Sequence, residues 1–175
     1  SAAEGAQRAD IVARFESSVT EIHEFRTLSE DQGWFAETEM MPLRCRRLLS
    51  TSRFVRGSGG GDDTAALSEQ IEEGRDCLEY LETIRGELPL APNHVTDYLT
   101  GRFMFALNRL ENAVKTGDAS YGKCVREARL WGKESLKMCK KHNRDRVEAK
   151  RYMGTFHWLT DKKRDALIWW SRSIE

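Results

Sequence analysis

Apolar side chains recur every three or four positions along nearly the whole chain of 175 residues. This spacing places them on one stripe of an α-helix, whereas a half-buried strand would need alternation with a period of two, which no segment shows. Prolines, which end or kink helices, occur only at positions 42, 89 and 92. The sequence therefore predicts an all-α fold.

Turn residues divide this pattern into about seven helices. They are predicted over residues 6–29, 34–54 with an interruption near Pro42, 63–88, 93–116 with Asn93 as its N-cap, 119–141, 146–159 and 163–174. Helices joined by connections this short are expected to pack as antiparallel hairpins, stacked as a right-handed α–α superhelix.

The same spacing predicts which side chains are buried. In the fourth predicted helix they are Val95, Leu99, Phe103, Ala106, Leu110 and Val114; in the fifth, Tyr121, Val125, Ala128, Leu136 and Cys139; in the seventh, Ala166, Leu167, Trp170 and Ile174.

Residues 57–62 form the one low-complexity stretch, and it is rich in glycine. We expect a flexible loop there, since a phosphate-binding loop would end in Gly-Lys-Ser/Thr after an apolar strand. The loop would separate an N-terminal helical pair, residues 1–56, from a helical-hairpin stack, residues 63–175. Both are expected to belong to one continuous domain, cut from a longer protein.

The cysteines and the hydropathy indicate a compartment. Two disulfides in a secreted domain would fit the number of cysteines, but their wide, unpatterned spacing favours reduced thiols in the core of a cytoplasmic protein. No apolar run approaches a membrane span, and no positively charged start followed by an apolar stretch marks a secretory signal. The cysteines are Cys45, Cys77, Cys124 and Cys139.

The last two predicted hairpins resemble each other, with turns at Thr116 and Thr160 that lie 44 residues apart. Residues 146–175 resemble a tetratricopeptide repeat. Small residues, Gly154 and Ala166, stand where two helices approach closely, and Trp170 would fill the space beside them. The other matching positions are Met153, Asp161 in place of the turn glycine, and Ser173, while Lys150 and His157 depart from the family pattern.

The resemblance implies a non-catalytic protein-interaction or regulatory scaffold. Repeats of this length are similar to those of bacterial signalling proteins, which attach helical arrays to cyclase, kinase, ATPase or transcription-regulator modules. The family binds partners in a groove lined by the first helix of each hairpin. The positions implied for that groove are Glu148, Arg151, Thr155 and Trp158.

Charge is distributed unevenly, although the net charge is zero. Residues 1–120 carry 13 Lys and Arg against 21 Asp and Glu, and residues 121–175 carry 15 against 7, a net of −8 and +8. The basic half favours an acidic protein or peptide partner. The alternative is a nucleic-acid-associated transcriptional regulator that uses the basic helices of residues 133–151. Its basic patch would be Lys133, Lys137, Lys140, Lys141, Arg144 and Arg146.

No constellation of residues indicates catalysis, a cofactor or a metal. His157 has no neighbour in the sequence that would orient it as a base. Cys139 and His142 have metal-like spacing, but a zinc site needs a second close pair of ligands. The acidic run Glu69, Glu72, Glu73 and Asp76 reads as a solvated helix face. We therefore expect no enzyme, and no membrane partner.

Overall fold

The computed structural model describes residues 64–87, 92–142 and 145–174, together with five scattered helical positions, 13, 14, 16, 17 and 20. The chain divides into two compact units, Ser1–Met41 and Pro42–Glu175. Every element described is an α-helix, and the described ranges contain no strand, as predicted. Apart from the five positions, the two helices predicted before residue 57 and the loop of residues 57–62 lie outside the described residues.

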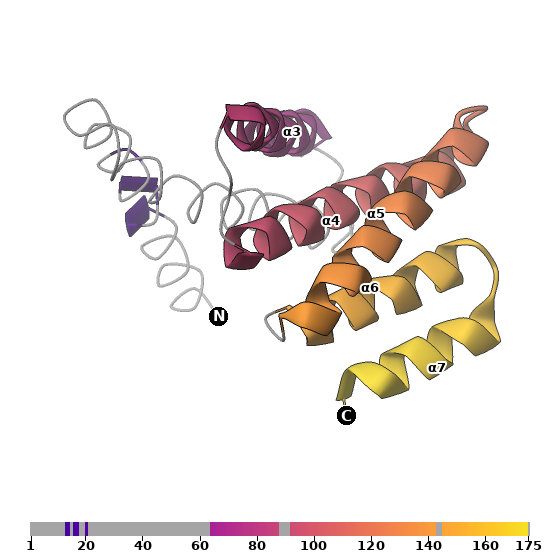
Figure 1. The fold of residues 1–175 in the computed structure, drawn as a ribbon. Coiled ribbons are helices and arrows are strands. Elements are labelled where there is room, and N and C mark those ends of the chain that lie inside the picture. Colours follow the sequence, from indigo (N-terminus) through magenta and orange to yellow (C-terminus); the bar gives the residue numbers. More distant parts are fainter. Residues whose placement is uncertain are drawn as a thin grey trace, which may run out of the picture. The chain divides into compact units, whose positions relative to one another are not determined.

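Five helices make up the described part of the second unit: α3 (Thr64–Glu87), α4 (Pro92–Thr116), α5 (Tyr121–Lys141), α6 (Arg146–Leu159) and α7 (Lys163–Ile174). Helices α4 and α5 form one hairpin, and α6 and α7 form another (Figure 1). Helix α6 contacts both helices of the first hairpin, whereas α3 contacts α4. These packed helices confirm the all-helical prediction.

The turns after α4 and α6 have the same backbone geometry. Gly117 and Asp161 adopt positive φ angles of 66° and 58°. In each turn the N–H of the next residue donates to a carbonyl five residues back, Asp118 to Ala113 at 3.1 Å and Lys162 to His157 at 2.8 Å. This hydrogen bond is that of a Schellman cap, which satisfies carbonyls left free at a helix end.

Proline sets the start of α4 one residue earlier than predicted. Asn93 was expected to be the N-cap, but the helix already begins at Pro92. Proline suits the first helical position for two reasons. An N–H at this position would have no partner within the helix, so proline loses nothing by lacking one, and its ring already fixes φ at a helical angle. Helix α3 ends at Glu87, ahead of Pro89, as predicted.

Small side chains mediate the close packing of α5. Its buried residues are Cys124, Ala128, Gly132, Ser135 and Cys139. A Cβ atom added at Gly132 would lie 2.8 Å from Met153 Sδ and 2.8 Å from Phe103 Cζ. Three helices therefore meet at a point where no side chain larger than hydrogen fits without rearrangement.

Several apolar residues predicted to be buried are exposed. The exposed fraction is 44% for Val114, 39% for Tyr121, 61% for Leu167 and 89% for Ile174. Val114 and Tyr121 flank the α4–α5 turn, where the partner helix ends. Helix α7 contacts only α6 among the described elements, so one of its faces has no helix to cover it.

Three of the four cysteines lie in the described helices, and all three are buried there: Cys77, Cys124 and Cys139. Cys45 lies outside the described residues, and the reduced state stays a prediction. Among the described helices, none has both the length and the apolar character needed to cross a membrane.

Candidate partner-binding surfaces

The α6–α7 hairpin is fixed by a close contact between Gly154 and Trp170. A Cβ atom added at Gly154 would lie 2.2 Å from Trp170 Cδ1 and 2.3 Å from Trp170 Nε1. The same indole N–H donates a 3.1 Å hydrogen bond to the carbonyl oxygen of Arg151. Ala166 is fully buried in this hairpin. The predicted packing of Trp170 beside Gly154 is confirmed.

Two of the four predicted groove residues, Thr155 and Trp158, line one open pocket of about 420 Å³. We call it the Trp158 pocket. Its other walls come from the last turns of α4 and from the end of α6: Glu111, Val114, Lys115 and Leu159. The Trp158 side chain is 49% exposed, and its ring centroid lies 5.7 Å from that of Trp170.

The other two groove residues, Glu148 and Arg151, lie one to two turns earlier on α6 and do not line this pocket. They pair with each other at 3.5 Å, and the Arg151 guanidinium lies 5.4 Å from the centre of the Tyr152 ring. The structure therefore brings Thr155 and Trp158 together. The backbone of Arg151 contributes a carbonyl oxygen that accepts the hydrogen bond from the Trp170 indole N–H.

Part of the predicted basic patch surrounds a second pocket, of about 310 Å³, which we call the basic pocket. Lys133, Lys137, Lys140 and Arg146 line it, whereas Lys141 does not. Arg144 lies outside the described residues. The remaining lining residues are Leu136, Cys139, Lys150 and Trp169.

Lys150 and Trp169 were not predicted to belong to this surface. Lys150 lies four residues after Arg146, on the same face of α6, and this spacing was the available signal. Its ammonium group donates to the carbonyl oxygen of Arg172 in the last turn of α7. Trp169 stacks on His157, with ring centroids 6.4 Å apart and an interplanar angle of 10°. Only the folded hairpin places Trp169 beside α5.

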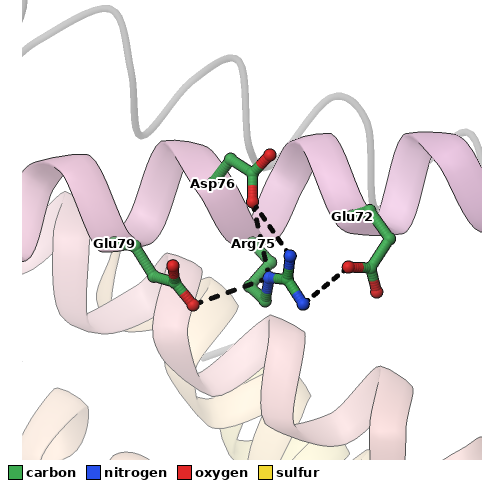
Figure 2. A network of polar contacts seen from close by, with 4 residues as sticks. All are labelled: Glu72, Arg75, Asp76 and Glu79. Carbon is green, nitrogen blue, oxygen red and sulfur yellow. Dashed lines mark hydrogen bonds and ion pairs between the residues drawn. The ribbon is translucent and has the colours of Figure 1, made fainter.

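The acidic residues of α3 form an exposed ion network around one arginine (Figure 2). The Arg75 guanidinium lies 2.6 Å from Glu72, 3.2 Å from Asp76 and 3.5 Å from Glu79. All four side chains are more than 40% exposed. Of the four residues predicted to form a solvated face, Glu72 and Asp76 are exposed, Glu73 is half-buried, and the side chain of Glu69 lies outside the described part.

Two titratable groups lie near the pockets. Burial raises the pKa of the Cys139 thiol to about 11, so this thiol stays protonated and is a poor nucleophile at neutral pH. Burial also lowers the pKa of His157, against the opposing effect of Asp165, whose Oδ2 lies 3.7 Å from Nδ1. In the described ranges, no three His, Cys, Asp or Glu side chains gather as a metal site would require.

Comparison with models of protein families, with curated proteins and with solved structures gives no match for this chain. The geometry of the two pockets therefore carries the functional argument.

Proposed function

We propose that this chain is a non-catalytic interaction segment of a larger cytoplasmic signalling or regulatory protein. It would form a tetratricopeptide-like superhelix of about seven helices, and it would hold a peptide or a neighbouring domain in the Trp158 pocket. The observation that carries the proposal is the exposed Trp158 indole at the wall of an open pocket between two hairpins.

The two hairpins support the repeat-like architecture. Their turns lie 44 residues apart in the sequence and share the Schellman geometry. The Gly154–Trp170 contact is the close approach that the tetratricopeptide resemblance requires. Both observations agree with stacked hairpins whose first helices face a common groove.

The exposed indole favours a binding role. A half-exposed tryptophan leaves a large apolar area in water, which is unfavourable unless another surface covers it. Tryptophan is also enriched at the centres of protein interfaces, where its truncation costs about 2 kcal/mol or more of binding energy. Trp158 contacts Trp170 on one side, so its indole is positioned before a partner arrives. A preorganised side chain loses little entropy on binding.

The pocket walls define the partner. Val114, Trp158 and Leu159 offer apolar contacts, whereas Glu111 and Lys115 pair with each other at 3.1 Å on the rim. The partner segment would therefore insert an apolar side chain. Acidic flanking residues would be attracted by the net charge of +8 on residues 121–175, which speeds encounter more than it tightens the complex.

The test is selection of peptides from a displayed random library on the whole chain. Peptides that bind should carry an apolar anchor with acidic flanks. Their affinity should fall by at least about tenfold in Trp158→Ala. The matched control is Leu130→Ala, since Leu130 is 54% exposed on α5 and lines neither pocket. Equal binding to both variants and to the wild type would refute the proposal.

The alternative, nucleic-acid binding by the helices of residues 133–151, has weaker support. A duplex needs cations spread along its backbone, whereas five of the basic residues in 133–151 surround one small pocket. Salt-dependent retention on DNA tests this alternative directly.

A further inference from the structure

The basic pocket brings five cationic side chains from two helices around one small space. Lys133, Lys137 and Lys140 come from α5, and Arg146 and Lys150 come from α6. Like charges gathered at short range repel each other, which destabilises the folded chain unless an anion neutralises them. A cavity whose walls carry one sign of charge also concentrates ions of the opposite sign.

Carboxylates of the described ranges neutralise little of the charge on the four lysines of this pocket, Lys133, Lys137, Lys140 and Lys150. Lys137 lies 3.9 Å from Glu134 in an exposed i,i+3 pair, which water screens almost completely. In the described ranges, no carboxylate lies within ion-pair distance of Lys133 or Lys140. The Lys150 ammonium is bound to the Arg172 carbonyl oxygen, which fixes its position without cancelling its charge.

The size and walls of the pocket restrict the ligand. A space of about 310 Å³ admits a small molecule and excludes a helix or a nucleic-acid duplex. Four lysines are better neutralised by a multiply charged phosphate chain than by a single carboxylate, since each phosphate offers several strong acceptors. The side chains of Leu136 and Trp169 add an apolar wall, which suits an organic body beside the phosphates.

We propose that the basic pocket binds a small phosphate-bearing ligand with several negative charges, such as a nucleoside polyphosphate. Lysines of α5 and Arg146 and Lys150 of α6 would hold the phosphates, and the organic part would lie against Leu136 and Trp169. This site is separate from the Trp158 pocket. It would allow a small anion to strengthen the packing of α5 on α6.

Calorimetric titration of the whole chain tests the site. The probes are ATP, inorganic tripolyphosphate and citrate, the last being a multiply charged anion without phosphate. The variant is Lys133→Gln/Lys140→Gln, which removes two exposed ammonium groups and no core contact. The matched control, Lys123→Gln/Lys141→Gln, makes the same charge change on α5 with two exposed lysines that do not line the pocket.

We expect the affinity for ATP to differ by less than about threefold between the wild type and the control. The same should hold for the affinity for tripolyphosphate. The affinity of the pocket variant for both ligands should be at least about tenfold lower, because charged hydrogen-bond donors have been removed. Tighter binding of ATP than of tripolyphosphate would assign a nucleotide as the source of the phosphates, and equal binding would assign an inorganic polyphosphate. Trp158→Ala should leave both affinities unchanged, so this result is independent of the proposed peptide site.

Three outcomes would overturn the proposal. Citrate binding as tightly as tripolyphosphate would indicate unspecific charge attraction. Equal losses of affinity in the pocket variant and the control would indicate a diffuse basic face that attracts any polyanion. Absence of phosphate binding at low salt would exclude the site altogether.

Discussion

Replacing Gly154 by alanine should destabilise the α6–α7 hairpin, although alanine is the better helix former. The added methyl carbon would lie 2.2 Å from Trp170 Cδ1 and 2.3 Å from Trp170 Nε1. Carbon atoms in contact stay at least about 3.5 Å apart, so the indole must move. Its movement would break the hydrogen bond to the Arg151 carbonyl oxygen and shift a neighbour of Trp158.

The magnitude follows from three opposing contributions. Overpacking costs about 1–3 kcal/mol, and loss of the indole hydrogen bond costs about 0.5–1.5 kcal/mol. Replacing glycine by alanine inside a helix gains at most about 1 kcal/mol. The net loss in the free energy of unfolding is then about 1–3 kcal/mol, because the partly exposed Trp170 can give way to some extent.

Thermal unfolding followed by circular dichroism measures this loss, at about 2–4 °C of melting temperature per kcal/mol. The control is Gly122→Ala, since Gly122 is an exposed α5 residue whose added Cβ would meet only Arg126 Nη1, at 3.8 Å. That variant should be as stable as the wild type or slightly more stable. If Gly154→Ala behaves like Gly122→Ala, the packing argument for the hairpin is wrong.

Three further outcomes are expected. Asp161→Gly should raise the melting temperature by a few degrees, because Asp161 has a φ angle of 58°, which glycine adopts without strain. Asp118→Ala should be less stable than the wild type at neutral pH, because the Ser120 N–H donates to the Asp118 carboxylate and holds its pKa below the ordinary value of 3.8. Protonation of Asp118 removes this stabilisation, so the difference in stability should shrink as the pH falls below 3.8. Iodoacetamide should label Cys139 slowly at mild alkaline pH, because burial raises the thiol pKa from 9.0 to about 11 and so lowers the thiolate fraction by about 100-fold. Mass spectrometry of the Cys139 peptide measures the labelling rate. Fast labelling of the folded protein would contradict the burial.

The boundaries of the five described helices could be predicted from the sequence to within two residues, since prolines, glycines and turn residues act locally. The packed face of α5 could be predicted only in part. Ala128 and Cys139 are buried, as predicted, whereas Tyr121 is exposed and Gly132 was missed, because the closeness of α4 selects small side chains there. The exposure of Leu167 likewise depends on whether another helix covers α7, which periodicity does not report.

The candidate site was predictable only within one helix. The repeat register placed Thr155 and Trp158 on one face of α6, and both line the same pocket. The opposite wall, including Val114, depends on how the two hairpins pack, and the sequence pattern assigned that residue to the core. The basic pocket likewise needs Trp169 of α7 beside the lysines of α5, which are far apart in the sequence.

The indole N–H signals in a heteronuclear NMR titration show whether Trp158 lies in the peptide-binding site. A selected peptide is added to the labelled chain, with the Trp158 signal assigned by Trp158→Phe. We expect the Trp158 signal to move in proportion to the fraction of the chain that has bound peptide. The signal of Trp131, whose ring packs against Tyr98 at 6.3 Å, should stay in place. A bound peptide that leaves the Trp158 signal unmoved would show that the peptide does not bind in the Trp158 pocket.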